Sequence, residues 1–310
     1  MAQVNMQHVK ELRDRTQAGL NDCRSALVEA EGDTDKAVEI ILKKGLAKSA
    51  KRAGAVATEG EVAAQVSADA TSGVLVEVNI QTDFAARNED FKAFVQRVLE
   101  AASKAKSGSD LGAERDPGGA ATLEDARQAL VGKLGENITM RRWERLTVDG
   151  PGRVASYVHM GGKIGVLVAA RAGSAEAAKH PAFGKLLEDV AMQVAAMGPL
   201  YLDKSAVPEA VRQKQAEIFD AQLVEEGKPE KARPKIIEGK LAKWLKEVCL
   251  LEQPSVLESE KSVDEVRAAV EKEVGAAVTL ERYVRYHLGE GIEKPQGPDF
   301  ASEVAKMAGA

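Results

Sequence analysis

Hydrophobic residues along the first fifty positions recur at roughly helical spacing, which places each group on one face of a helix. The three groups are Val4, Val9 and Leu12; Cys23, Ala26, Leu27 and Ala30; and Ala37, Val38, Ile41 and Leu42. Gly32 at a C′-like position is expected to stop the second helix, and Asp33 or Thr34 to cap the third. Gly45 is expected to end the third helix. We therefore predict a three-helix N-terminal domain over residues 1–56, with a core that is small for independent stability.

The segment from Lys43 to Arg52 carries five basic residues and no strong apolar stripe. One interpretation is a solvated linker between domains, and the other is a phosphate-binding patch. The pattern favours the linker.

Further along the chain the pattern changes to strict alternation, which predicts half-buried strands. One predicted hairpin carries Val62, Ala64 and Val66, then Val74, Val76, Val78 and Ile80; the other carries Val154, Ser156 and Val158, then Val166, Val168 and Ala170. Gly161-Gly162 is a good pair for a tight turn in the second hairpin. A helix is predicted over 89–104, with Phe91, Phe94, Val95, Val98 and Leu99 on one face.

The middle of the chain repeats itself. GEVAAQVS from Gly60 matches GRVASYVH from Gly152, 92 residues later, and the segment from Thr122 to Leu146 matches the segment from Ser262 to Tyr286 at an offset of 140. Each copy therefore has a hairpin, two helices and a final strand. We predict an α+β fold with a duplicated core and small antiparallel sheets. The first subdomain is expected over 57–151 and the second over 152–199 and 250–288.

The second copy contains about 48 extra residues between its helices, which form an arm over 200–249. Two amphipathic helices joined at Gly227–Pro229 predict an antiparallel hairpin. The hairpin is either an association arm or an intramolecular prop against the core. The remaining residues, 289–310, form a C-terminal module.

Composition and charge narrow the function. The net charge of −5 and the pI of about 5.6 give no basic footprint for nucleic acid. No apolar run approaches the ~20 residues of a membrane span, and the N-terminus lacks the hydrophobic region of a signal peptide. The two cysteines, Cys23 and Cys249, lie far apart and are expected to be reduced thiols in the cytoplasm.

Motifs of enzyme chemistry are missing from the sequence. We find no phosphate-binding loop, no nucleophile elbow, and no zinc-like spacing among the four histidines and two cysteines. His159 stands beside Met160 on a hairpin and is expected to be neither a metal ligand nor a base. We predict a protein that binds rather than an enzyme, with no cofactor and no metal.

Phe84 stands out in a chain that is only 4% aromatic. The stretch NIQTDFAARNEDF places it in a polar segment between a predicted strand and a predicted helix. The repeat aligns it with Glu176, so the architecture does not need an aromatic there. Phe84 either fills a gap between strand and helix or is an exposed anchor for a partner.

Several segments, in order along the chain, resemble the translation elongation factor Ts family. They are VKELRDRTQAGLNDCRSAL (Val9 to Leu27), EVNIQTDFAARN (Glu77 to Asn88), LGENITMRR (Leu134 to Arg142), HMGGKIGVLV (His159 to Val168), YHLGEGIEK (Tyr286 to Lys294) and DFASEVAKM (Asp299 to Met307). The chain departs from the family at Thr16-Gln17-Ala18-Gly19-Leu20-Asn21, where Thr-Gly-Ala-Gly-Met-Met is usual. It also has Cys23-Arg24 in place of Cys-Lys.

The resemblance implies a UBA-like N-terminal bundle, a duplicated core, a coiled-coil arm and a C-terminal helix. It implies a guanine-nucleotide exchange factor that binds GDP-loaded elongation factor Tu, displaces its Mg²⁺ and releases GDP so that GTP can bind. The alternative is a non-catalytic scaffold or chaperone that uses the arm.

The resemblance also implies site residues. The family's wedge into the magnesium site falls on Thr82, Asp83, Phe84 and Ala85, and further partner contacts fall on His159, Met160, Gly161, Leu20 and Asn21. Asp83 is expected to orient the wedge or disturb the surroundings of the metal, unless its side chain only caps the local turn. The arm is expected to join two copies of the chain or to contact elongation factor Tu.

Overall fold

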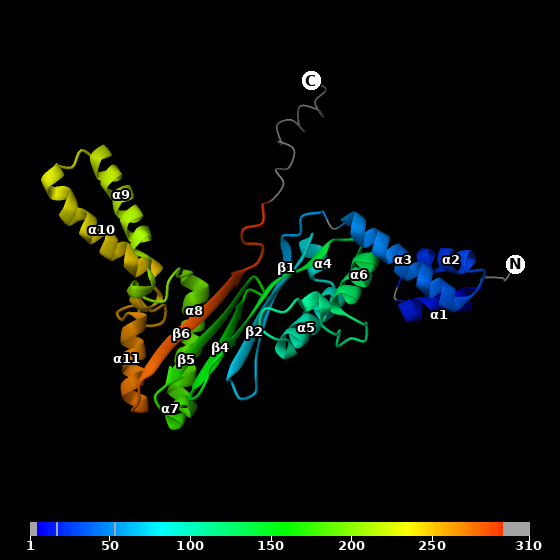
Figure 1. Cartoon of the computed structure of the whole chain (residues 1–310), viewed down its shortest axis with the longest axis horizontal. Coiled ribbons are helices and arrows are strands. Elements are labelled where there is room, and N and C mark those ends of the chain that lie inside the picture. The colour runs from blue at the N-terminus through cyan, green and yellow to red at the C-terminus, as the bar shows by residue number, and fades with distance from the viewer. Residues whose placement is uncertain (1–4, 17, 53, 294–310) are drawn as a thin grey trace, which may run out of the picture. The chain divides into compact units, whose positions relative to one another are not determined.

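The computed structural model describes residues 5–16, 18–52 and 54–293. They fold into helices and two three-stranded sheets joined by turns and loops (Figure 1). Val4, Gln17 and residues 294–310, with the helix predicted in the C-terminal module, lie outside the described residues. The chain divides into two compact units. One comprises the chain up to Ala63, Val76–Trp143 and the chain from His287; the other comprises Ala64–Leu75 and Glu144–Tyr286.

The N-terminal bundle consists of α1 (Met6–Thr16), α2 (Leu20–Glu29) and α3 (Thr34–Arg52). Most of the described stripe residues form its core, in which Val9, Leu12, Cys23 and Leu27 are at most 1% exposed. Leu42 of the third stripe is instead 54% exposed. Cys23 is a free thiol. Asp33 caps α3, because its Oδ1 accepts the backbone N–H groups of residues 35 and 36, each at 3.0 Å.

The end of α2 differs in detail from the prediction. Gly32 donates its N–H to the carbonyl of Leu27 at 2.8 Å, and Glu31 donates to Val28 at 3.2 Å. Glu31, with φ 53°, therefore occupies the left-handed C′ position, and Gly32 follows it. Gly32 therefore marks the end of α2 as predicted, but it lies one residue beyond the C′ position.

Helix α3 does not end at Gly45, as the sequence suggested, but continues to Arg52. Gly45 lies against Gly132 of α6 (Leu123–Leu134), where a Cβ on Gly132 would be 3.2 Å from the Gly45 Cα. The absence of side chains lets the two helix backbones come close, so Gly45 serves packing rather than termination. The basic segment Lys43–Arg52 is therefore part of a helix.

The first sheet has the strand order β1 (Glu59–Val66), β2 (Ser72–Ile80) and β3 (Ile138–Thr147). Between β2 and β3 run α4 (Asp83–Ala86), α5 (Glu89–Lys104) and α6. Helix α5 has the predicted bounds, and its predicted apolar face is buried, with Phe91, Phe94 and Val95 fully inaccessible to solvent. Helix α4, which carries Phe84, is thus followed directly by a helix that is anchored in the core.

The Gly-rich segment Ser107–Gly119, between α5 and α6, is held by hydrogen bonds to its neighbours. It contains a short 3₁₀ helix, Leu111–Ala113, and the indole of Trp143 donates to the Ser109 carbonyl at 3.0 Å. Asp116 is 2% exposed and accepts hydrogen bonds from the Arg97 side chain at 2.9 Å and from two backbone N–H groups at 3.0 and 3.1 Å. A buried, paired carboxylate fixes the loop.

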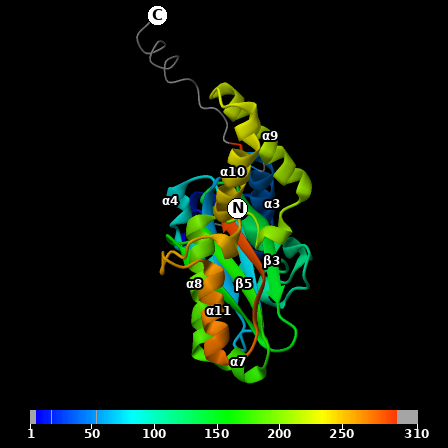
Figure 2. The same cartoon turned by 90° about the vertical axis from the view of Figure 1, so that its left-hand side faces the viewer.

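The second sheet has the order β4 (Gly152–His159), β5 (Ile164–Ala172) and β6 (Val278–His287). β4 and β5 are antiparallel, with Gly152 opposite Arg171 and His159 opposite Ile164. Helices α8 (Pro181–Met197) and α11 (Val263–Val274) lie on one face of this sheet (Figures 1 and 2), and the short α7 (Ala175–Lys179) precedes α8. Phe183, Leu187 and Val194 of α8 are fully buried in the shared core.

The predicted duplication extends to individual hydrogen bonds. Thr122 and Ser262 each form a capping box at the start of α6 and α11. Arg127 donates to the Ile138 carbonyl at 2.8 Å, and Arg267, its counterpart 140 residues later, donates to Val278 at 2.8 Å. The two copies are thus built in the same way, so each position in one copy can be compared with its counterpart in the other.

The inserted arm consists of α9 (Glu209–Glu225) and α10 (Arg233–Val248), joined by a turn and the short 3₁₀ helix Glu230–Ala232. Leu223 is 1% exposed between the helices, and Lys240 lies 5.7 Å from the ring centre of Phe219. Helix α10 packs on α9 and on the short helices at its two ends, and the pair extends away from the second sheet (Figures 1 and 2). This arrangement favours the association arm over the intramolecular prop.

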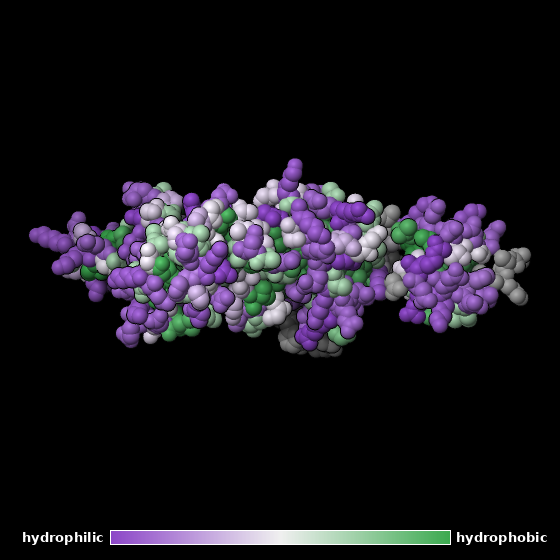
Figure 3. All heavy atoms as spheres, turned by 90° about the horizontal axis from the view of Figure 1, so that it is seen from below, coloured by the Kyte–Doolittle hydropathy of each residue, from purple (hydrophilic) through white to green (hydrophobic). Residues whose placement is uncertain are grey.

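The surface drawn in Figure 3 is mostly hydrophilic, with hydrophobic residues in several separate groups. None of the described helices combines the length and the apolar character that crossing a membrane requires.

Candidate partner-binding site

The motif Thr82-Asp83-Phe84-Ala85 folds as the short helix α4. Thr82 has extended backbone angles (φ −120°, ψ 151°), and its Oγ1 accepts the N–H of Ala85 at 3.2 Å, which begins the helix. Asn88 then caps α5 by accepting the Asp90 N–H at 2.8 Å. Two caps within seven residues fix the path of the backbone on both sides of Phe84.

A carboxylate from the other end of the subdomain holds the start of α4. Glu136 accepts the Thr82 N–H at 3.0 Å with Oε2 and the Thr82 hydroxyl at 2.8 Å with Oε1. The neighbouring Asn137 donates its N–H to the Gln81 side chain at 2.7 Å. Sequence reasoning did not assign Glu136 a role, because the two residues lie 54 positions apart and no periodicity connects them.

Phe84 projects from this anchored helix into solvent and is 86% exposed, the highest value among the large hydrophobic side chains that the structure describes. Ala85 is only 8% exposed, because its methyl group seats the helix on the body of the unit. The alternative in which Phe84 fills a gap between strand and helix is therefore wrong. Ala85 lies on the buried side of this four-residue helix, and Phe84 lies on the exposed side.

The second copy provides an internal comparison. Ser174 caps α7 by accepting the Ala177 N–H at 3.1 Å, in the same way as Thr82 caps α4. Glu176, the counterpart of Phe84, is also exposed. The scaffold thus presents this position to solvent twice, and it carries a polar residue in one copy and an aromatic residue in the other.

Asp83 is exposed beside Phe84 and forms an ion pair with Arg87 at 2.9 Å. The cap of the turn is Thr82, so the alternative in which Asp83 only caps the turn is wrong. An exposed ion pair of this kind contributes about 0–1 kcal/mol, so a partner can displace Arg87 at little cost.

The second predicted group lies at the tip of the β4–β5 hairpin. The loop has four residues, 160–163, and Lys163 donates its N–H to the His159 carbonyl at 3.1 Å. Met160, Gly161 and Gly162 all have positive φ angles, of 50°, 62° and 93°. The expected two-residue turn at Gly161-Gly162 is therefore wrong, since the left-handed path begins one residue earlier.

The imidazole of His159 is held by Tyr157, a residue that sequence reasoning did not select. Tyr157 Oη and His159 Nδ1 are 3.0 Å apart, and their rings stack with centres 5.8 Å apart. Residues two apart on a strand share a face, which is the only sequence signal for this pair. Met160 follows with 72% of its side chain exposed.

The third predicted group, Leu20 and Asn21, begins helix α2 and is exposed, Leu20 to 43%. The predicted residues thus form three local groups, on α4, on the β4–β5 hairpin and on α2. Each presents apolar or polar side chains to solvent from a fixed backbone.

The chemistry of these groups is that of recognition. Among the described residues, no group of three or more His, Cys, Asp or Glu could hold a metal ion. A single exposed Phe, a Met and an imidazole provide contact area and hydrogen bonds, and a buried aromatic is a common centre of binding energy in interfaces. Exposed apolar side chains on a fixed backbone are typical of proteins that bind another macromolecule.

Comparison with known proteins identifies the family. A model of the family Elongation factor TS matches residues 81–290. The chain is 46% identical over 304 residues to elongation factor Ts of a Nitratiruptor species, covering 97% of this chain and 98% of that protein. It is 44% identical over 308 residues to elongation factor Ts of Clostridium perfringens, covering 99% of each. The chain belongs to the elongation factor Ts family.

Proposed function

We propose that this protein is the guanine-nucleotide exchange factor of elongation factor Tu in cytoplasmic translation. It binds the GDP-loaded GTPase, weakens GDP binding and releases GDP so that GTP can bind. The observation that carries the proposal is Phe84, an almost fully exposed aromatic on a helix fixed by Thr82 and Glu136. Membership of the elongation factor Ts family supports it.

The proposed wedge consists of Thr82, Asp83, Phe84 and Ala85, acting near the magnesium site of the GTPase. Mg²⁺ demands nearly ideal octahedral geometry, so a small displacement of its surroundings weakens its binding. Asp83 and Phe84 are the exposed members that meet the partner, and Ala85 seats them. Because coupling is reciprocal, the factor weakens GDP by the same ratio as GDP weakens the factor.

We infer that Phe84 does not act alone. Burial of one Phe supplies about 1.5–3 kcal/mol, and each tenfold change in affinity requires about 1.4 kcal/mol. Phe84 thus accounts for roughly one to two orders of magnitude. Larger weakening requires further contacts, which we assign to His159, Met160 and Gly161 on the hairpin and to Leu20 and Asn21 on α2.

We propose that the arm is an association surface, for a second copy of the chain or for elongation factor Tu. Exposed apolar residues on α9 include Ile218 and Val224, which are 42% and 55% exposed. Sedimentation tests the two alternatives: a dimer of the protein alone supports the second copy, and a complex with elongation factor Tu that is lost when the arm is removed supports elongation factor Tu.

The decisive experiment is stopped-flow release of fluorescent GDP from elongation factor Tu, with and without catalytic amounts of this protein. The proposal expects a release rate that rises with the concentration of the factor and multiple turnovers per molecule of factor. Binding without any change in GDP release would instead support a scaffold or chaperone that uses the arm.

A further inference from the structure

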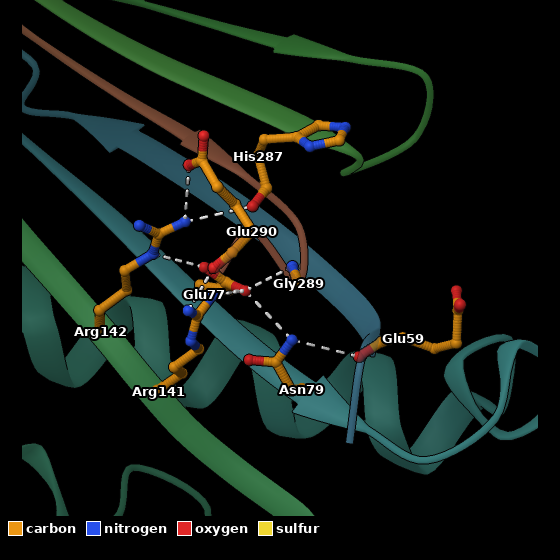
Figure 4. Close-up of polar contacts among 8 residues, drawn as sticks. All are labelled: Glu59, Glu77, Asn79, Arg141, Arg142, His287, Gly289 and Glu290. Carbon is orange, nitrogen blue, oxygen red and sulfur yellow. Dashed lines mark hydrogen bonds and ion pairs between the residues drawn. The ribbon is translucent and has the colours of Figure 1, made fainter. Parts of the chain in front are cut away.

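A buried carboxylate on β2 collects donors from three parts of one unit (Figure 4). Glu77 is 1% exposed, and its Oε1 accepts hydrogen bonds from Asn79 at 3.1 Å, from Arg141 at 2.9 Å and from the Gly289 N–H at 2.8 Å. Its Oε2 accepts from Arg142 Nε at 2.5 Å. Burial by itself would raise the pKa of Glu77, but these hydrogen bonds together lower it. The carboxylate is therefore charged at neutral pH.

The same two arginines hold the chain where it leaves β6. Arg142 Nη2 donates to the His287 carbonyl at 3.1 Å and lies 3.5 Å from the Glu290 carboxylate. Arg141 Nη2 donates to the Glu290 carbonyl, and Figure 4 shows both arginines pointing toward this turn. Residues 287–290 are thus gripped by side chains on β3.

Gly289 fits this position because it has no side chain. Its φ is 72°, in the left-handed region, and a Cβ there would lie 2.6 Å from the Thr58 carbonyl oxygen. The N–H that reaches Glu77 depends on this close approach. Backbone and carboxylate therefore specify one path for the chain at residue 289.

The duplicated scaffold does without this cluster in its second copy. Ala169 occupies the position of Glu77, and Glu281 occupies that of Arg141. The sheet therefore does not need a buried carboxylate at this place. Burying a charge is unfavourable unless it is fully paired, so the cluster has a role that the second copy lacks. That role involves residues 287–290, which follow the last repeated strand.

We propose that Glu77 is a positioning residue that fixes the chain at Gly289–Glu290 relative to helix α4. β2, which carries Glu77, ends at Ile80, and the chain reaches Thr82 two residues later. One strand therefore positions both the Phe84 helix and the start of the C-terminal module. The proposal takes both segments to contact elongation factor Tu, which then meets them already arranged. Preorganisation of this kind strengthens binding by removing the entropic cost of ordering. The inference rests on the proposed exchange function.

The first test uses the full chain alone and is independent of exchange. A spin label is attached through Glu293→Cys, which is selective because the native Cys23 and Cys249 are buried. Glu77→Gln should increase the mobility of the label. The control is Asp116→Asn, which disturbs another buried carboxylate–arginine pair of the same unit, and it should leave the label unchanged. Equal mobility in wild type and Glu77→Gln overturns the proposal.

The second test separates positioning from folding. Glu77→Gln should raise the KM for GDP-loaded elongation factor Tu by roughly 5- to 30-fold, which corresponds to about 1–2 kcal/mol, while kcat changes little. If a variant only loses folded protein, the apparent kcat falls and KM stays the same. We expect this result for Asp116→Asn, with a fall in kcat that follows its loss of stability. A lower kcat with an unchanged KM in Glu77→Gln would show a structural role only.

The third test breaks the same contact from the other side. Gly289→Ala forces the backbone away from Thr58 and should raise KM by a similar factor. Because both variants remove one interaction, the double variant should be no worse than the more impaired single variant. Additive effects would contradict the assignment. If wild type fails to release GDP while the label still responds to Glu77→Gln, the proposed function fails and the positioning of residue 289 stands.

Discussion

Glu136 grips Thr82 with both carboxylate oxygens, accepting its backbone N–H at 3.0 Å and its hydroxyl at 2.8 Å. Because Thr82 is the N-cap of α4, this pair determines where the exposed side chain of Phe84 points. Glu136 itself is not among the predicted contact residues, so its effect on exchange must act through Thr82.

Glu136→Ala should lower kcat/KM for exchange by roughly 5- to 30-fold, the factor for a loss of about 1–2 kcal/mol of positioning. Glu136→Gln keeps one acceptor oxygen and should recover part of the activity. Both bonds lie at the surface, so thermal stability should change little. GDP-release kinetics and a thermal melt check this. A variant with wild-type kinetics would show that Thr82 holds α4 by itself.

Phe84→Ala should lower kcat/KM for GDP release by roughly one to two orders of magnitude, because about 1.5–3 kcal/mol of burial on the partner is lost. Its melting temperature should match wild type, since the side chain is 86% exposed in the free protein. The matched control is Glu176→Ala, the same truncation at the equivalent position of α7, which should leave exchange intact. A strongly reduced melting temperature would show that Phe84 supports the fold.

Tyr157→Phe removes one hydroxyl and leaves the ring that stacks on His159. We expect the ¹⁵N chemical shifts of the His159 ring to change, because Nδ1 loses its hydrogen-bond partner at 3.0 Å. If His159 contacts the GTPase as proposed, exchange should slow by a few-fold, about the loss of one hydrogen bond of roughly 1 kcal/mol. Unchanged ring shifts would show that the pair does not form in solution.

The contribution of Glu77 to the free energy of unfolding should be lost in acid. Its pKa is lowered in the folded protein, where the charges facing it are Arg141 and Arg142, with Glu290 beyond them. A lowered folded pKa contributes stability above the unfolded value of about 4.3, and that stability is lost as the pH falls through the folded pKa. The difference in unfolding free energy between wild type and Glu77→Gln should therefore be constant near neutral pH and shrink below about pH 4.3.

Urea denaturation of both proteins from about pH 7 to about pH 3.5 measures this difference. Other carboxylates with lowered pKa values make both proteins less stable in acid, so the difference between the two proteins is the informative quantity; they include Asp33, Glu124, Asp203 and Glu265. A difference that stays constant over the whole range would show that the charge of Glu77 contributes nothing.

Local signals predicted the elements well. The apolar spacing of Phe91, Phe94 and Val95 identified α5 with its observed bounds, and Asp33, one of the two predicted caps of α3, caps it with its own side chain. The offsets of 92 and 140 residues predicted two copies that share even their arginine–carbonyl bonds. Hydrophobic spacing and helix caps depend on residues within one or two turns of each other. A repeat can be found by comparing the sequence with itself. Both signals are therefore present in the sequence alone.

Two predictions that rested on glycines differ from the structure. Gly45 suggested a helix end, but it is the place where α3 crosses Gly132 of α6. Gly161-Gly162 suggested a two-residue turn, but Met160 already has a positive φ. A glycine permits both a left-handed backbone and a close approach, and only the neighbouring element decides which one is used.

The sequence by itself determined the duplicated α+β core, the inserted helical hairpin and the aromatic Phe84 in a polar segment between a strand and a helix. Only the tertiary structure decided that Phe84 faces solvent, that Glu136 anchors its helix across 54 residues, and that Glu77 reaches Gly289 across 212. Periodicity and capping act over a few residues and leave a signature in the chain. Contacts between distant carboxylates and backbone groups arise only once the strands and helices have packed, because the packing brings their partners within reach.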